Sequence, residues 1–391
     1  MNRLGHPPRR MSSPTDSFLV SKRSRISKDQ SGVDKETYES PDLWFDDGNI
    51  IIRTVFSENV YTVYKVHKSI LASYSNVFCD LFDGPQTAFD TASDHYEGLP
   101  VIELPDPPSQ FNDFLKALYF PEETQRHRPI SSPFLEGIWK GFPYKYVGIL
   151  HLAMKYDVAH LRDHMLSTLR HAWPQYLFDW DYLQKRTEDL ERVYLRRECF
   201  DLSFAHPEPA RTIRLAMEHN ILDILPVVFY DLARVHEVIA PNPHEGFRRA
   251  DLSVLTADDL RRLAQGRGAL RGKFLDGITN LLIVHPHEDC KRIPVPGKPS
   301  PCRAGLKKWW DTQLGAVSGP SVADPIGWLR EKVFLCDDIP HDEVCGGCTR
   351  VVKRYLEAVR EELWTSLPEF FGLKGLLHPN WGKEPEPKLW F

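Results

Sequence analysis

The chain has 391 residues, of which 42% are hydrophobic and 26% are charged. This length and apolar content allow roughly two to three domains with packed cores. The net charge of -5 argues against a protein that coats nucleic acid through a broadly basic surface.

Hydropathy and cysteine content set the expected environment. No apolar run approaches the roughly 20 residues needed to span a bilayer, and the N-terminus lacks the apolar core of a signal peptide. We therefore expect a soluble, intracellular protein without a membrane partner. The seven cysteines of such a chain predict reduced thiols or metal ligands rather than a disulfide framework.

Residues 1–41 are rich in serine, proline and charge and contain few large apolar side chains, so we expect a disordered basic tail. The basic cluster of Lys22, Arg23 and Arg25 is typical of a nuclear localisation signal or a weak phosphate-binding arm, and equally of a solubilising tail. Both a cytoplasmic and a nuclear location therefore remain open.

The next segment predicts a small sheet packed on helices. Residues 49–66 alternate β-branched and aromatic side chains on both sides of a polar turn, which predicts a β-hairpin. Residues 68–82 place their apolar side chains on one helical face, as expected of a helix-turn-helix under that hairpin. Residues 99–104 predict a further strand, before a proline-rich turn.

More helices are expected after this strand. Apolar side chains recur with helical spacing over residues 111–118, and two further stripes between residues 146 and 169 end before Pro174. The intervening residues, about 121–144, are rich in proline and lack periodicity. They predict a surface loop whose aromatic side chains either dock a partner or fold back on the domain.

Several motifs carry a resemblance to a known family. They are Trp44-Phe45-Asp46-Asp47-Gly48, Val66-His67-Lys68, Leu225-Pro226-Val227-Val228-Phe229-Tyr230, and the segment from Leu363 to Leu373. Together they resemble the BTB/POZ-domain proteins that are multiplied in mushroom-forming fungi. The resemblance implies an α+β protein: a BTB/POZ domain at residues 42–174, a short β-sheet covered by helices, then a mainly α-helical C-terminal domain at residues 175–373 and a tail at residues 374–391.

The same resemblance implies function through protein binding. BTB/POZ domains self-associate or hold other proteins, so we expect a non-catalytic interaction scaffold that forms a homo-oligomer. An alternative is a substrate adaptor of a cullin-based ubiquitin ligase, although the expected apolar-x-Glu motif after Phe82 is approximated only by Ala88-Phe89-Asp90. A nuclear transcription regulator is a second alternative, which the basic tail alone favours.

The C-terminal half predicts mainly helices. Residues 210–234 read as two helices broken at Pro226, and Thr256 is a helix N-cap followed by acidic residues. The glycines of residues 266–273 lack both the spacing of a phosphate-binding loop and a preceding strand. We therefore interpret them as the end of a helix and a loop.

The clearest chemical signal is a set of four cysteines. Cys345 and Cys348 form a Cys-x-x-Cys knuckle, and Cys290 and Cys302 flank a proline-rich loop. Four thiolates suit a tetrahedral structural zinc ion that would join this loop to the final helix. Reduced thiols without a metal remain the alternative. The substitute ligands, should one cysteine point away, are His285, His287, Cys336 and His341.

Sequence motifs for catalysis are missing. The chain has no His-Glu-x-x-His pair, Gly-x-Ser-x-Gly elbow, Walker loop or dinucleotide fingerprint. His67 lies where a strand meets a helix, so we expect it to make a structural hydrogen bond or cap, and Asp46 and Asp47 to flank a turn at Gly48. We therefore do not expect an enzyme.

Overall fold

The computed structural model describes residues 24–28, 34–83, 95–121, 144–196, 207–235, 250–281, 290, 300–315 and 323–383. The chain divides into two compact units. Of the described residues, those up to 121 and those from 144 to 167 belong to the N-terminal unit, and those from 168 onward belong to the helical unit. The expected loop insertion, apart from its two ends, lies outside the described residues.

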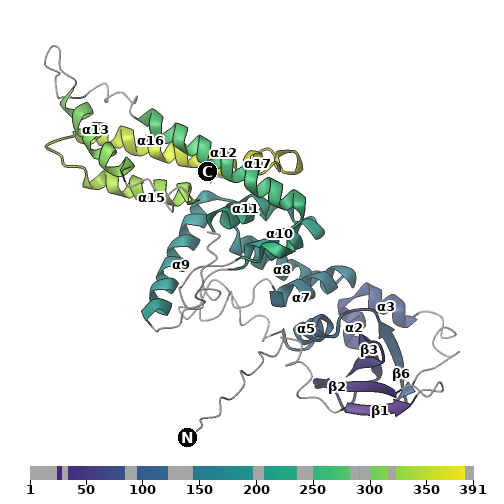
Figure 1. The fold of residues 1–391 in the computed structure, drawn as a ribbon. Helices are drawn as coiled ribbons and strands as arrows, with labels where there is room; N and C mark the ends of the chain where they lie inside the picture. The colour runs from purple at the N-terminus through teal and green to yellow at the C-terminus, as the bar shows by residue number, and fades with distance from the viewer. Residues whose placement is uncertain are drawn as a thin grey trace, which may run out of the picture. The chain divides into compact units, whose positions relative to one another are not determined.

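The N-terminal unit contains a mixed sheet with the strand order β1-β2-β4-β3-β6 (Figure 1). The strands are β1 (Ser24–Lys28), β2 (Asp34–Trp44), β3 (Ile50–Ser57), β4 (Val60–Val66) and β6 (Leu99–Leu104), and the short β5 (His95–Tyr96) pairs with β6. The predicted hairpin is β3 and β4, which pair antiparallel, with Asn59 in the left-handed conformation at the turn. The pairs β2–β4 and β3–β6 are parallel.

Helices complete the described part of this unit. They are α2 (Lys68–Tyr74), α3 (Asn76–Asp83), α5 (Pro108–Tyr119), α7 (Tyr144–Lys155) and α8 (Ala159–Ala172), the last of which continues into the helical unit. The predicted helix-turn-helix of residues 68–82 divides at Ser75, whose hydroxyl accepts a hydrogen bond from the Phe78 amide. The Phe78 ring stacks on Tyr156 with 4.5 Å between ring centroids, and Tyr64 of β4 donates a hydrogen bond to the Pro108 carbonyl. Aromatic packing thus joins the sheet to its helices.

The expectation of disorder up to residue 41 is wrong for the part that the structure describes. Residues 24–28 form β1, and residues 34–41 belong to β2, which pairs parallel with β4. This pairing satisfies backbone hydrogen-bonding groups regardless of side-chain composition, so a polar sequence can still form a strand. Residues 1–23 lie outside the described residues, and with them Lys22 and Arg23.

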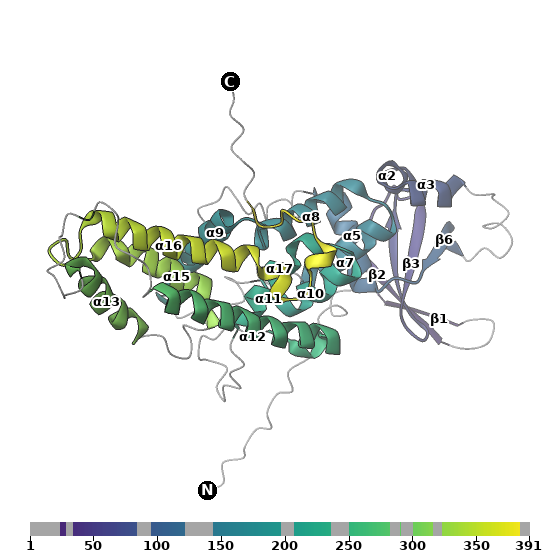
Figure 2. The same cartoon turned by 90° about the horizontal axis from the view of Figure 1, so that it is seen from above.

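The second unit is mainly helical, as predicted. Its helices are α9 (Leu177–Arg196), α10 (Pro209–Glu218), α11 (Leu225–Arg234), α12 (Ala257–Asn280), α13 (Pro301–Leu314), α15 (Pro325–Leu335), α16 (Gly346–Thr365) and the short α17 (Leu367–Phe370). Helices α12, α15 and α16 lie side by side in both views (Figures 1 and 2). None of the helices in the described ranges is long and apolar enough to cross a membrane.

Helix α12 corrects the interpretation of the glycine-rich segment. The predicted Thr256 cap is present and forms a capping box with Asp259, but the helix runs through residues 266–273 instead of ending there. A Cβ atom at Gly266 would lie 2.0 Å from the ring of Phe371, so glycine permits this ring to pack on the helix backbone. Tertiary packing therefore outweighs the low helix propensity of glycine at this position.

The predicted helix break near Pro226 lies earlier in the chain. Helix α10 ends at Glu218 and α11 begins at Leu225, with a short 3-10 turn (Leu222–Ile224) between them. Pro226 occupies the first turn of α11, where its missing amide hydrogen would have no intrahelical partner in any case. The proline therefore starts the second helix rather than breaking a longer one.

A partly buried arginine joins three helices of this unit. Arg234 of α11 has its Nε 3.1 Å from a carboxylate oxygen of Asp324 and its Nη1 3.7 Å from Asp231. These contacts are ion pairs without hydrogen-bond geometry, whereas Nη2 donates a hydrogen bond to Gln184 of α9. Asp324 also caps α15 through the Gly327 amide and accepts a hydrogen bond from the Tyr230 hydroxyl. The start of α15 is thereby fixed to α11.

We expect Arg234→Met to lower the free energy of unfolding of the helical unit by about 3–5 kcal/mol, because Asp231 would remain buried without its cation. Urea unfolding followed by tryptophan fluorescence measures this loss. The control Arg261→Met removes an exposed pair with Asp258 and should change stability little. Equal stability of the two variants would contradict the structural role of Arg234.

Candidate metal centre

Four cysteines from distant parts of the sequence converge in the helical unit. The Sγ atoms of Cys290, Cys302, Cys345 and Cys348 all lie within 4.8 Å of one another. Cys290 Sγ is 3.6 Å from Cys302 Sγ and 3.8 Å from Cys345 Sγ. Cys302 and Cys348 are buried, and the other two are partly exposed. The structure thus brings together the four residues that the sequence predicts.

Two helix N-termini hold three of these thiols. Cys302 lies in the first turn of α13, which begins at Pro301 after the Ser300 cap. Cys345 is the N-cap of α16, and Cys348 lies in its first turn. The amide groups and dipole at a helix N-terminus favour negative charge, so both helices stabilise thiolates at this place.

Hydrogen bonds to sulfur add to this effect. The Cys345 amide lies 3.3 Å from Cys302 Sγ and donates to it. The amide of Cys348 donates to Cys345 Sγ and is the main cause that lowers the pKa of the Cys345 thiol to about 7. Burial raises the pKa of Cys302 above its usual value, and a nearby cation would favour its thiolate.

The spacing of the sulfur atoms fits a tetrahedral metal site. Zinc–sulfur bonds of about 2.3 Å place the corners of a tetrahedron about 3.8 Å apart, whereas a disulfide requires about 2.05 Å. The distances from Cys290 Sγ to Cys302 Sγ and to Cys345 Sγ, 3.6 and 3.8 Å, match the former. Four soft thiolate donors select zinc over hard cations such as magnesium. The four-cysteine cluster could therefore hold a zinc ion.

The substitute ligands do not join this group. Among the described residues, Cys336 and His341 lie outside the set of side chains that could share a metal. Cys336 is buried at the end of α15, and burial raises the pKa of its thiol to about 12. His285 and His287 lie outside the described residues.

His67 makes structural contacts, as the sequence predicts. Its backbone amide donates a hydrogen bond to the Tyr119 hydroxyl at 2.9 Å, and its Nε2 lies 3.1 Å from Asp47. Asp46 and Asp47 form the turn before Gly48, whose amide bonds back to Phe45. His67 provides no side-chain cap for α2, so its ring joins the turn and the end of α5 instead.

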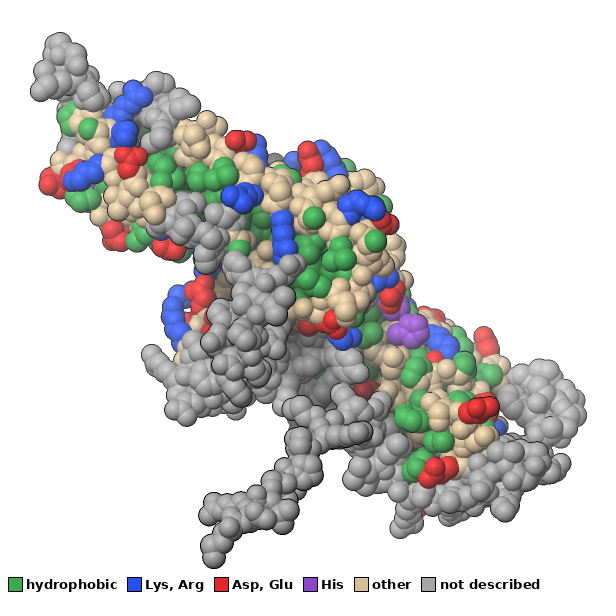
Figure 3. Space-filling model, viewed as in Figure 1, with side chains coloured by type: hydrophobic (Ala, Val, Ile, Leu, Met, Phe, Trp, Pro, Cys, Tyr) green, Lys and Arg blue, Asp and Glu red, His purple; other side chains and the backbone are tan. Residues whose placement is uncertain are grey.

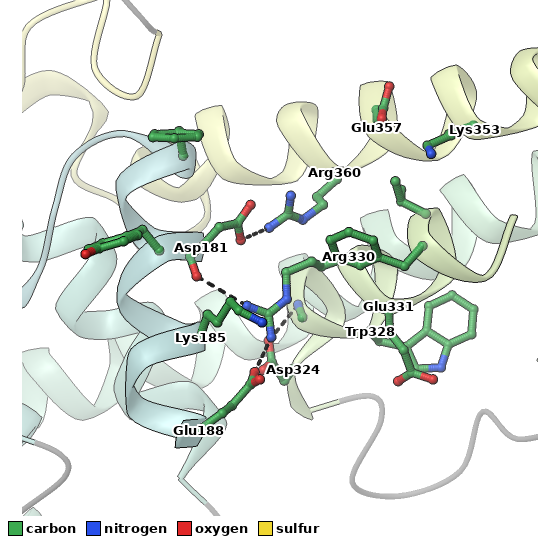
Figure 4. Close-up of a pocket in the computed structure, with 15 residues that line it drawn as sticks. Asp181, Lys185, Glu188, Asp324, Trp328, Arg330, Glu331, Lys353, Glu357 and Arg360 are labelled. Atoms are coloured by element: carbon green, nitrogen blue, oxygen red, sulfur yellow. Dashed lines mark hydrogen bonds and ion pairs between the residues drawn. The ribbon is translucent and has the colours of Figure 1, made fainter. Parts of the chain in front are cut away.

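A groove in the helical unit was not predicted from the sequence. It has a volume of about 1070 Å³ and lies between α9, α15 and α16 (Figure 4). Phe178, Tyr182 and Phe334 line it although each is more than half exposed. The spacing of Phe178, Tyr182 and Lys185 places them on one side of α9, but the sequence does not show that this side faces solvent.

Comparison with known proteins leaves the family of this chain open. No protein-family model matches the chain, and neither the curated proteins nor the solved structures contain a significant match. The resemblance to BTB/POZ proteins therefore rests on the sequence motifs alone.

We expect the metal-free, reduced protein to bind one equivalent of Co²⁺ with the absorption of a tetrahedral thiolate complex. Cys302→Ser should weaken binding strongly, because it removes a buried ligand and leaves three. Cys336→Ser is the matched control, since Cys336 is also buried but lies outside the cluster. A titration that Cys302→Ser leaves unchanged would show that cobalt binds elsewhere.

Proposed function

We propose that the protein is a non-catalytic protein-interaction scaffold, with a BTB/POZ-like N-terminal unit that self-associates and a helical unit that a structural zinc ion stabilises. One observation carries this proposal. The N-terminal unit follows the element order expected from its BTB-like motifs: a hairpin (β3, β4), a helix pair (α2, α3), a strand (β6), a helix (α5) and a closing helix pair (α7, α8).

The helix pair α2 and α3 offers a surface for self-association. Tyr74 and Val77 lie on either side of the break at Ser75 and are 44% and 40% exposed. Covering large apolar side chains from water is favourable, and a second copy could cover these two through a two-fold, self-complementary contact. This surface includes the first helix after the hairpin, which often contributes to dimers of BTB domains.

We expect the full chain to sediment as a dimer at micromolar concentration. Tyr74→Asp/Val77→Asp should weaken dimerisation by about tenfold or more, because a two-fold contact brings each new carboxylate close to its copy. Leu260→Asp changes a leucine of similar exposure on α12 and should leave the dimer intact. A monomeric wild-type chain would refute self-association.

The structural role of zinc follows from where the four cysteines lie. Cys290 and the N-termini of α13 and α16 meet at the cluster, so one ion would hold three separate segments together. A catalytic zinc ion keeps one coordination position open for water or substrate, whereas four cysteine ligands fill a tetrahedron. The proposed ion therefore stabilises the fold and performs no reaction.

We expect native mass spectrometry of the purified chain to show one zinc ion, absent from Cys345→Ser/Cys348→Ser. When free zinc exceeds the dissociation constant of the site about 1,000-fold, the ion should raise the melting temperature of the helical unit by about 10 °C, and a chelator should remove this gain. The melting temperature of the N-terminal unit should stay the same. Full stability without metal would contradict the structural role.

The two alternative functions depend on residues outside the described part of the chain. The segment expected to contact a cullin, which includes Ala88-Phe89-Asp90, falls within the undescribed residues 84–94. Of the basic cluster, Lys22 and Arg23 also lie outside the described residues, whereas Arg25 lies in β1. No structural observation thus favours either alternative over the scaffold.

A further inference from the structure

The four cysteines of the cluster differ in their access to solvent. Cys290 and Cys345 are partly exposed, whereas Cys302 and Cys348 are buried. Each partly exposed sulfur has a buried sulfur beside it, because Cys290 Sγ lies 3.6 Å from Cys302 Sγ and Cys345 Sγ lies within 4.8 Å of Cys348 Sγ. Redox-sensing cysteines are typically exposed thiolates next to a second cysteine that resolves their oxidised form. The cluster contains two pairs of this kind.

The position of the pairs on their helices favours reaction as well. Cys345 is the N-cap of α16 and Cys348 lies in its first turn, and thiolates of Cys-x-x-Cys motifs at helix N-termini are the reactive form of cysteine. Cys79 of the N-terminal unit is also partly exposed, but the carboxylate of Asp83 raises the pKa of its thiol. Cys79 therefore serves as an internal comparison of equal access and lower reactivity.

The surface around the cluster does not select an oxidant by charge. On the face shown in Figure 3, basic and acidic side chains lie close together at the end of the helical unit where α13 lies. Lys307 pairs with Asp311, and Lys308 pairs with Glu343. These pairs leave little net field, so a small uncharged oxidant such as hydrogen peroxide meets no electrostatic barrier.

We propose that the cluster is a redox switch in which hydrogen peroxide converts its four thiolates into two disulfides, Cys290–Cys302 and Cys345–Cys348, and thereby releases the zinc ion. The inference rests on the proposed zinc site and adds the condition that regulates it. Cys302 is favoured as the partner of Cys290 because its sulfur lies closer than that of Cys345, 3.6 Å against 3.8 Å. Formation of this disulfide leaves Cys345 with Cys348.

Each disulfide forms in two steps. The exposed thiolate attacks one oxygen of hydrogen peroxide, the O–O bond breaks, and sulfenic acid forms while hydroxide leaves and takes up a proton. The buried thiolate then attacks the sulfenic sulfur, the S–O bond breaks, and the second hydroxide leaves as water. Each pair of sulfurs thus loses two electrons, which reduce one peroxide molecule to two molecules of water. Zinc leaves because disulfide sulfur is no longer an anionic ligand.

This oxidation separates two helices that the metal-bound form joins. Cys290–Cys302 connects only the segment before α13 to α13 itself, and Cys345–Cys348 lies within the start of α16. No sulfur then links α13 to α16. Trp310, near the other end of α13, still donates a hydrogen bond of 3.2 Å to a backbone carbonyl of α12. Oxidation therefore loosens the first turns of α13 and leaves its second half in place.

The test is treatment of the reduced, zinc-loaded, full-length protein with hydrogen peroxide, with released zinc measured by a colorimetric chelator. One zinc ion per chain should be released while the cluster consumes about two equivalents of peroxide. Dithiothreitol followed by zinc should restore the metal-bound protein. Zinc that stays bound until Cys79 has been oxidised would overturn the proposal, because Cys79 is the less reactive thiol.

Peptide mass mapping of the oxidised protein identifies the disulfides. The pairs Cys290–Cys302 and Cys345–Cys348 are expected, whereas Cys290–Cys345 with Cys302–Cys348 would keep α13 joined to α16 and overturn the proposal. Amide hydrogen exchange in the first turns of α13 should become about tenfold faster or more after oxidation, while exchange near Trp310 stays the same. Unchanged exchange in both parts contradicts the release of α13.

A variant tests the role of the buried partner. In Cys348→Ser, oxidation of Cys345 should proceed to sulfinic acid, which dithiothreitol does not reduce. Full recovery of the Cys345 thiol would show that another group resolves it, against the proposed pairing. The control is Cys336→Ser, which removes a buried thiol outside the cluster and should release zinc and form both disulfides as the wild-type chain does.

The metal content before oxidation separates this inference from the proposed zinc site. A purified chain that contains no zinc and binds none when it is added refutes both. A zinc-bound chain that keeps its ion under peroxide refutes the switch alone and leaves the structural role of zinc standing. Release of zinc with sulfinic acids in place of disulfides would be irreversible damage, and it also overturns the proposal.

Discussion

The requirement that buried charges be paired organises the helical unit. Asp324 forms an ion pair with Arg234, accepts a hydrogen bond from Tyr230, and caps α15. Because α15 starts at this point, its direction sets one wall of the groove. The chain then leads through Ile339, which is buried, to the cysteine knuckle at the start of α16. This ionic contact thus fixes the start of the helix that forms one wall of the groove.

The two sites depend on helix ends and helix faces in different ways. The cysteine cluster uses the N-termini of α13 and α16, where free amide groups favour thiolates. The groove uses the first half of α9 and the middle of α16, where Lys353, Glu357 and Arg360 lie on one side of the helix. The cluster and the groove therefore use different residues of the same helix.

Aromatic side chains fill much of the core of the N-terminal unit. Phe78, Phe111 and Phe114 surround Tyr156, and Tyr64 contacts Phe111. The hydroxyl of Tyr156 is satisfied by Asp106, so the ring can be buried without leaving a polar group unpaired. This core leaves the outer side of α2 and α3 free to present Tyr74 and Val77.

The sequence by itself determined the features that local pattern encodes. Alternating residues predicted the β3–β4 hairpin, helical spacing predicted α5 and the helix pairs, and the Cys-x-x-Cys knuckle with two further cysteines predicted the four thiols that converge. Thr256 was predicted as a cap because its hydroxyl acts within one turn. Such features can be predicted from the sequence because they depend on near neighbours or on rare residue types.

Only the tertiary structure decided the rest, because it depends on contacts between distant residues. The polar segment at β2 became a strand through pairing with β4, and Gly266 stayed helical because Phe371 packs against it. The exposure of Phe178 and Phe334, and with it the groove, follows from which helix faces are covered. Burial is a property of the assembled fold, so an aromatic side chain at a helical position has the same spacing whether it lies in the core or on a surface.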